Sequence, residues 1–158
     1  MRNCGLTCWP TDKPIPYFFS TYTKDTPMVR AALARIQERT CLSFQESPVP
    51  VIIAMEFRND GKCSAGLGLP PGGVRPIRLG CNNGIAGAMH EIIHALGFHH
   101  TQSRMDRDEY IIVNEDNIRP KLKGQFKKED QDIAGEFGTV YDRGSIMHYG
   151  QSRSHRLT

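Results

Sequence analysis

The feature that most constrains the fold of this chain is the segment HEIIHALGFHH, which spans residues 90–100. His90 and His94 are four residues apart, so on a helix their imidazoles lie on one face, one turn apart. This is the spacing at which two imidazole nitrogens reach one zinc ion. Glu91 projects about a quarter of a turn away, within reach of a water at that ion without being a ligand. The segment therefore predicts a helix that carries a metal site.

Gly97 and His100 extend the same pattern. Gly97 can adopt the left-handed conformation that ends a helix and turns the chain back. His100, six residues after His94, then approaches the metal from the opposite side, which a straight helix would not allow. Three neutral histidines leave zinc an open coordination position, which is typical of catalytic sites. With Glu91 as general base, the pattern predicts metal-assisted hydrolysis of an amide bond, with one zinc ion per chain.

Two other interpretations of this segment explain it less well. Ile92, Ile93, Ala95 and Leu96 form an apolar face, so we expect the helix to be buried whatever its function. A purely structural core helix, however, has no need of three histidines and a glutamate, because an unpaired buried carboxylate is costly. A closed structural zinc site would need a fourth Cys or His at ligand spacing, and the sequence has none there.

Size and charge exclude several other classes of protein. The chain has 158 residues, the size of one globular domain, and no run of about 18 apolar residues that would span a membrane. Its net charge is +3, from 20 Lys and Arg against 17 Asp and Glu. Most basic residues alternate with acidic or apolar ones, so no nucleic-acid partner is predicted. The oligomeric state is not indicated by the sequence.

Hydrophobic periodicity predicts an α+β chain. Thr26 followed by Pro27 is a typical helix start, and Gly97 is a typical helix end. The expected elements are a strand over residues 15–20, a helix over about 26–39, a short alternating segment over 42–45, a buried strand over 49–57, a loop over 64–73, a short strand over 74–79 with Pro76 at a sheet edge, a second helix from 82–84 to Gly97, and a loop-rich remainder with a short helix over about 120–128.

Two long motifs carry a family resemblance. HEIIHALGFHHTQSRMDRD, residues 90–108, resembles the zinc signature of the astacin family of metzincin metalloendopeptidases, and GSIMHY, residues 144–149, resembles its Met-turn. Weaker matches extend over nearly the whole chain. The resemblance implies a single metalloprotease catalytic domain over residues 1–158, with a twisted mixed sheet and two main helices, the second carrying the zinc motif. It also implies an N-terminal subdomain over about 1–97 and an incomplete C-terminal subdomain over about 98–158.

The resemblance also assigns roles to individual residues. The implied zinc ligands are three histidines: His90, His94 and His100. Glu91 is implied as the general base. Tyr149 matches the tyrosine that ligates the resting metal and then swings to stabilise the tetrahedral oxyanion, and Met147 is implied as the hydrophobic floor of the site. The implied protein is a secreted zinc endopeptidase that acts on a peptide or protein substrate, made with a signal peptide and a propeptide outside these residues.

The sequence departs from the family at several positions. Thr101 replaces the Glu that fixes the mature N-terminus, and Val140 and Arg143 replace a Pro and a Tyr before the Met-turn. Residues 64–67 match the edge strand that pairs with an extended substrate, but the arginine that usually follows is absent. The family domain continues well beyond Gly150, so we expect a C-terminally truncated domain. A second hypothesis therefore stays open, namely a catalytically impaired metal- or peptide-binding fragment or decoy.

Five cysteines leave at least one thiol without a partner in the chain. The resemblance implies that Cys63 pairs with Cys81. Cys4 and Cys8 resemble the extra N-terminal pair of hatching-enzyme-like members of the family. Cys41 is then left over, and its family counterpart bonds to a cysteine near the end of the domain, so we expect Cys41 to be unpaired here.

Some polar residues near the motifs are expected to be structural. His99 and His148 flank functional positions, and we expect them to face packing or solvent. Four charged residues follow the third histidine, and we expect them to form an ion-pair network that holds the loop. They are Arg104, Asp106, Arg107 and Asp108.

Overall fold

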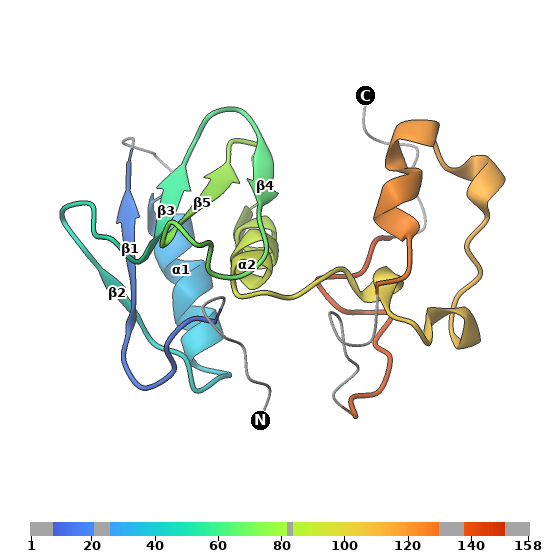
Figure 1. The fold of residues 1–158 in the computed structure, drawn as a ribbon, viewed down its shortest axis with the longest axis horizontal. Helices are drawn as coiled ribbons and strands as arrows, with labels where there is room; N and C mark the ends of the chain where they lie inside the picture. The colour runs from blue at the N-terminus through green and yellow to red at the C-terminus, as the bar shows by residue number, and fades with distance from the viewer. Residues whose placement is uncertain (1–7, 21–25, 82–83, 130–137, 151–158) are drawn as a thin grey trace. The chain divides into compact units, whose positions relative to one another are not determined.

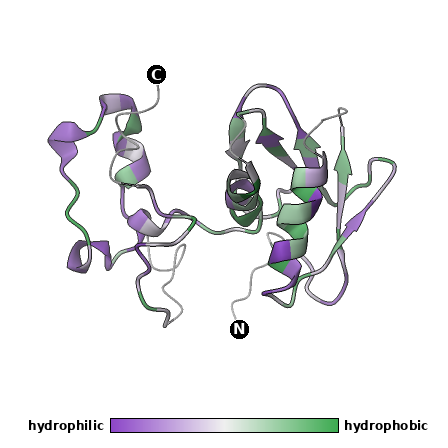
Figure 2. Ribbon diagram, turned by 180° about the vertical axis from the view of Figure 1, so that it is seen from behind, coloured by the Kyte–Doolittle hydropathy of each residue, from purple (hydrophilic) through white to green (hydrophobic). Residues whose placement is uncertain are grey.

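The computed structural model describes residues 8–20, 26–81, 84–129 and 138–150. The chain divides into two compact units, Met1–Phe98 and His99–Thr158, which are described separately. Hydrophobic residues are concentrated in the first unit, whereas the second is largely hydrophilic (Figure 2). Among the described residues, no helix has the length and apolar character needed to cross a membrane.

The first unit contains a five-stranded sheet with the strand order β2-β1-β3-β5-β4 (Figure 1). Its strands are β1 (Ile15–Phe19), β2 (Phe44–Glu46), β3 (Ala54–Arg58), β4 (Cys63–Ala65) and β5 (Val74–Leu79). The pairs β1–β2, β1–β3 and β3–β5 are parallel, and β4 runs antiparallel to β5. The sheet is therefore mixed, which confirms the predicted α+β class.

Two α-helices, α1 (Thr26–Gln37) and α2 (Gly84–Ala95), contact each other and share one core with the sheet. Helix α1 begins at Thr26 with Pro27 next to it, as predicted, and ends two residues before the predicted Arg39. Its buried residues recur at helical spacing: Val29, Ala32, Leu33 and Ile36. They pack in the same cluster as Met55, Phe57 and Ile77 of the sheet and Ile92 of α2. Each of the larger side chains in this cluster (Val, Leu, Ile, Met and Phe) contributes about 1.5–3 kcal/mol through burial.

Trp9 connects the start of the described chain to the end of α2. Its indole is buried, and Nε1 donates a hydrogen bond of 2.7 Å to the carbonyl oxygen of Ala95. The last carbonyls of a helix have no partner within the helix, so this bond satisfies one of them. Trp9 thereby holds the N-terminal segment against the part of α2 where the predicted metal ligands lie.

Three predictions about the sheet need correction. The strand expected over residues 49–57 begins only at Ala54, because Pro48 and Pro50 cannot donate to a ladder and the intervening segment is exposed. The segment 64–73 is not all loop, since β4 includes residues 64 and 65. Pro76 does not lie on an edge strand: β5 lies between β3 and β4. The proline is accommodated because β4 pairs only with residues 77–79.

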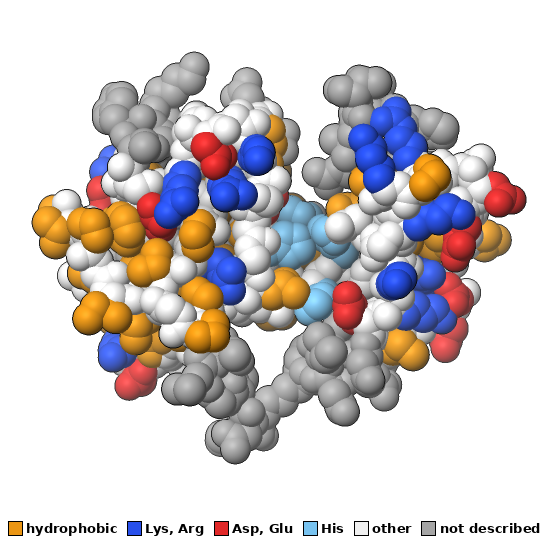
Figure 3. Space-filling model, turned by 45° about the horizontal axis from the view of Figure 1, so that its top comes forward, with side chains coloured by type: hydrophobic (Ala, Val, Ile, Leu, Met, Phe, Trp, Pro, Cys, Tyr) orange, Lys and Arg blue, Asp and Glu red, His pale blue; other side chains and the backbone are white. Residues whose placement is uncertain are grey.

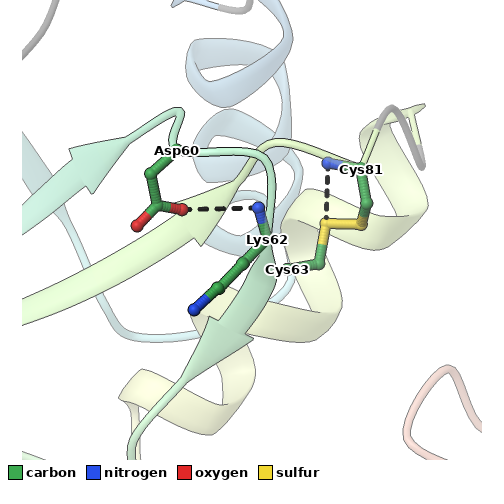
Figure 4. The surroundings of a disulfide bond; sticks show 4 residues. All are labelled: Asp60, Lys62, Cys63 and Cys81. Atoms are coloured by element: carbon green, nitrogen blue, oxygen red, sulfur yellow. Dashed lines mark hydrogen bonds between the residues drawn. A yellow bond between two sulfur atoms is a disulfide. The ribbon is translucent and has the colours of Figure 1, made fainter.

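The β4–β5 hairpin is closed by a disulfide between Cys63 and Cys81, whose Cα atoms are 5.6 Å apart (Figure 4). This is the pair that the resemblance implied. The backbone N–H of Cys81 also donates to the Cys63 sulfur at 3.2 Å. Cys41 is exposed and free in the part of the chain that the structure describes. Cys4 lies outside the described residues, so its pairing with Cys8 stays a prediction.

The second unit contains four short 3₁₀ helices among its described residues: Thr101–Ser103, Arg107–Glu109, Glu115–Asn117 and Pro120–Phe126. The last of them occupies most of the segment where a short helix was predicted. The predicted ion-pair network is confirmed: Arg104 binds Asp106, while Arg107 and Lys128 both bind Asp108. In the space-filling view, basic side chains of this unit lie beside acidic ones (Figure 3). Hydrogen bonds from Lys128 and, to a smaller extent, from Arg107 hold the pKa of Asp108 below its usual range.

Candidate metal centre

Helix α2 ends with the turn that Gly97 was predicted to make. The backbone N–H of Gly97 donates to the carbonyl of His94 at 2.8 Å, and Phe98 N–H donates to Ile93 at 3.2 Å. Gly97 has a φ of 106°, a backbone conformation that residues with a Cβ rarely adopt. The helix therefore stops directly after its second predicted ligand, and the chain is free to change direction before His100.

The two histidines of α2 are oriented differently from each other. His90 is buried, and its ring meets the ring of His94 edge to face with centroids 4.6 Å apart. His94 Nδ1 lies 2.8 Å from the carbonyl oxygen of Phe98. A carbonyl can only accept, so Nδ1 carries the proton in this bond, and Nε2 of His94 is the nitrogen with a lone pair for a metal.

His90, His94 and His100 each offer a ring nitrogen, and these nitrogens all lie within 4.8 Å of one another. Two nitrogens bound to one zinc at about 2.1 Å each are at most about 4.2 Å apart, so a small movement of these side chains would bring the set to ligand distance. Three imidazoles are also the donor type that zinc takes in catalytic sites with an open position. The three histidines therefore form a donor set that could hold one metal ion and that fits zinc in kind.

Glu91 follows the first of these histidines and is itself buried, with 8% of its surface exposed. Buried carboxylates are uncommon because desolvation of the charge is costly unless it is offset. Its burial next to a predicted metal ligand distinguishes it from a solvated surface glutamate.

In the second unit, residues 145–148 form a tight turn. Met147 N–H donates to the Ser145 hydroxyl at 3.2 Å, and His148 N–H donates to the Ser145 carbonyl at 2.9 Å. Met147 is buried, and its carbonyl accepts a 3.0 Å hydrogen bond from the backbone N–H of Thr101. Thr101 uses its backbone in this contact, so the replacement of the family's Glu at this position does not affect it.

Tyr149 lies next to the third histidine, with its ring centroid 4.4 Å from that of His100. Its hydroxyl donates to Oε1 of Gln125 at 3.4 Å, and its backbone N–H donates to Oε1 of Gln102 at 3.1 Å. The ring of Phe126 meets it edge to face at 5.8 Å. The structure thus brings Tyr149 beside a predicted ligand and holds it at both its backbone and its hydroxyl.

Sequence reasoning missed the two glutamines that hold Tyr149. Gln102 is 1% exposed, and its Nε2 donates to the carbonyl of Gln125 at 3.4 Å. The buried Arg107 donates to the Gln102 carbonyl at 3.0 Å and also to the carbonyl of Phe126. A single glutamine has no charge and no spacing pattern, so only its place inside the long 90–108 motif could have drawn attention to Gln102.

His99 and His148 are not among the gathered ligands, as predicted. His99 Nδ1 lies 3.6 Å from the Glu129 carboxylate. His148 contacts the Tyr141 hydroxyl through Nε2 at 2.9 Å and the Tyr149 carbonyl through Nδ1 at 2.7 Å. Burial raises the pKa of Tyr141 above its usual value, so its hydroxyl stays protonated and able to donate. Both histidines therefore have structural partners.

Nearly the whole chain matches a known protein family. The model of the peptidase family described as "Astacin" matches residues 2–157. The zinc metalloproteinase dpy-31 of Caenorhabditis elegans is 38% identical over 156 residues, which cover 92% of this chain and 25% of that protein. The zinc metalloproteinase nas-13 of the same organism is 34% identical over 142 residues, covering 85% and 30%. The chain thus spans less than a third of the length of these relatives.

A solved structure supports the same assignment. High choriolytic enzyme 1, a hatching enzyme zinc-protease from Oryzias latipes, aligns with a TM-score of 0.84 and 27% identity, covering 98% of this chain and 78% of that chain. Myroilysin aligns with a TM-score of 0.62 and 18% identity, covering 90% of this chain and 80% of that chain, and supports the fold alone. These neighbours confirm the predicted metzincin-type catalytic fold.

Proposed function

The chain belongs to the astacin family of peptidases, and on this premise we propose that it forms the catalytic part of a zinc-dependent endopeptidase that cleaves peptide or protein substrates. The observation that carries the proposal is the set of three histidine nitrogens within 4.8 Å of one another, together with the buried Glu91 beside the first of them. We also propose that the two compact units are the subdomains of one catalytic domain.

In this proposal His90, His94 and His100 hold one zinc ion. When bound there, zinc supplies a Lewis acid that polarises a peptide carbonyl and lowers the pKa of water. Glu91 accepts a proton from the attacking water and returns it to the leaving amine, so that neither a free hydroxide ion nor an amide anion has to form. Burial of Glu91 supports this role because it keeps bulk water from competing for the proton.

The hydroxyl of Tyr149 is proposed to donate a hydrogen bond to the oxyanion that forms on the substrate carbonyl. Its ring lies against His100, and its hydroxyl has a protein acceptor, Gln125, to which it can return. Met147 is proposed to form the apolar floor, consistent with its burial in the turn before Tyr149. The edge strand β4 is proposed to pair with an extended substrate.

The disulfide between Cys63 and Cys81 supports a secreted location, because disulfides form and persist in oxidising compartments. Thr101 in place of the family's Glu favours one second candidate, a zinc- or peptide-binding decoy without turnover. A decoy that binds zinc differs from the enzyme only in hydrolysis, and a decoy that binds only peptide differs from it in zinc binding as well.

The test is cleavage of a mixed peptide pool, detected by mass spectrometry. It is run on the chain as prepared, after metal removal by a chelator, and after zinc is added back. We expect cleavage that disappears with the chelator and returns with zinc. Glu91→Gln should keep zinc and lose about 10²–10⁴-fold in turnover. Glu38→Gln, at an exposed glutamate after α1, is the matched control and should cleave normally. Zinc binding without hydrolysis of any peptide would favour the decoy, and full activity of Glu91→Gln would exclude the proposed base.

A further inference from the structure

Arg75 lies on β5, opposite Met55 of β3, and its half-buried guanidinium reaches the segment that follows β4. Its Nε donates to the carbonyl of Gly68 at 2.7 Å, and its Nη2 donates to the carbonyl of Leu67 at 2.8 Å. Two neighbouring donors of one rigid fork therefore bind two successive carbonyls. A planar guanidinium fixes the direction of both bonds, which a lysine ammonium would not do.

The backbone of the same segment is packed tightly against this guanidinium. A Cβ added to Gly66 would lie 2.1 Å from Nη1 of Arg75, so the absence of a side chain at Gly66 allows the close approach. On its other side, the segment contacts α2: the buried Gly68 donates its N–H to the carbonyl of His94 at 3.2 Å. Residues 66–68 are therefore held between Arg75 and the end of the helix that carries two predicted metal ligands.

Arg75 differs in its partners from the other arginines of the central strands. Arg58 pairs with Glu56 and Arg78 pairs with Asp60, whereas no carboxylate lies within ion-pair distance of Arg75 among the described residues. Burial lowers the pKa of Arg75 from its usual value, a cost that no acidic partner offsets. A half-buried cation that binds only carbonyls orients the backbone and adds no ion pair.

We propose that Arg75 is a positioning residue that fixes residues 66–68 against the end of α2 and so sets where the edge of β4 ends for an extended peptide substrate. β4 lies at the edge of the sheet (Figure 1). Arg75 binds the carbonyls of Leu67 and Gly68, and the Gly68 N–H binds His94, so the backbone groups with no described partner that an added strand can use lie mainly before Gly68. This inference rests on the proposed function, because it concerns how the substrate of that reaction is held.

The first test measures the segment itself, by NMR hydrogen exchange of the Gly68 amide with and without added zinc. Arg75→Gln removes the charged fork and should speed exchange of this amide about tenfold, because two charge-assisted hydrogen bonds are lost. Arg75→Lys should fall between this variant and the parent chain. Arg78→Gln, on the same strand but bound to Asp60, is the matched control and should leave Gly68 unchanged.

The second test measures peptide cleavage by the zinc-loaded chain. Arg75→Gln should raise KM several-fold with kcat nearly unchanged, since a looser docking edge weakens substrate binding without altering the chemistry. Arg75→Lys should recover part of the loss. An unchanged Gly68 exchange rate in Arg75→Gln would overturn the proposal, as would equal loss of protection at Ile77 in the middle of the sheet. Because the exchange measurement needs no substrate, failure of the proposed protease function would be seen separately, as absent cleavage by the parent chain.

Discussion

The backbone N–H of Tyr149 donates a 3.1 Å hydrogen bond to the side-chain oxygen of Gln102, a residue that is only 1% exposed. The nitrogen of the same side-chain amide donates a hydrogen bond to the backbone carbonyl of Gln125. The side-chain oxygen of Gln125 in turn accepts a hydrogen bond from the Tyr149 hydroxyl. The buried side-chain amide of Gln102 therefore connects the backbone of Tyr149 with Gln125, the residue that accepts a hydrogen bond from the Tyr149 hydroxyl. The position of Tyr149 depends on a side chain that touches neither metal nor substrate in the proposed mechanism.

Gln102→Met tests this connection, because methionine keeps the volume and removes both hydrogen bonds. The Tyr149 N–H would then lack its described acceptor, and we expect the free energy of unfolding to fall by about 1–3 kcal/mol. Urea denaturation monitored by circular dichroism measures the change. Gln45→Met, at an exposed position of β2, is the control and should change stability little. Equal losses in the two variants would show that the buried amide is not important.

Gly80→Ala tests the packing at the end of the β4–β5 hairpin that carries the Cys63–Cys81 disulfide. A Cβ at Gly80 would lie 2.2 Å from the backbone nitrogen of Gly61 and 2.5 Å from its Cα. Backbone atoms cannot rotate away as a flexible side chain can, so we expect a loss of about 1–3 kcal/mol from overpacking. Gly72→Ala, where nothing lies within 4 Å of the added carbon, is the matched control. A melting temperature of Gly80→Ala equal to that of Gly72→Ala would contradict the prediction.

Glu46→Gln tests the contribution of one carboxylate to acid stability. Arg30 donates two 2.8 Å hydrogen bonds to Glu46, and this contact holds the pKa of Glu46 below its usual range. A carboxyl with a lowered folded-state pKa stabilises the fold above its unfolded value of about 4.3, and this contribution is lost as pH falls through the folded value. The unfolding free energy of Glu46→Gln should therefore fall less than that of the parent between about pH 6 and pH 3.

The control for this measurement is Glu38→Gln, at an exposed glutamate that forms no ion pair among the described residues. Its free energy of unfolding should fall with decreasing pH as steeply as that of the parent chain. Parallel pH profiles for the parent and Glu46→Gln would mean that the contact between Arg30 and Glu46 does not persist in solution.

The elements that the sequence predicted well are those with local signals. Thr26 and Pro27 mark the start of α1, and Gly97 marks the end of α2, because each position has a backbone requirement that few residue types meet. The spacing of His90 and His94 likewise implies a shared helical face without knowledge of the rest of the chain. Such features could be found from the sequence because their physical cause lies within a few residues.

Features that depend on distant parts of the chain were not predicted. The apolar run at residues 49–53 resembles a buried strand, yet the structure leaves Ile52 85% exposed, because pairing with β5 begins only at Ala54. Pro76 was expected at an edge because its missing N–H was judged locally, without the strand order. Gln102 holds a residue 47 positions away, and such a contact leaves no periodic trace in the sequence.

The most direct test of the account is zinc stoichiometry in matched histidine variants, measured by elemental analysis and competitive chelator titration. The parent chain should bind one zinc ion, and His90→Ala, His94→Ala and His100→Ala should each lose it. His99→Ala and His148→Ala, whose rings have structural partners beside the functional positions, should bind zinc like the parent. Loss of zinc in His99→Ala as complete as in His100→Ala, or retention in all five variants, would contradict the proposed metal centre.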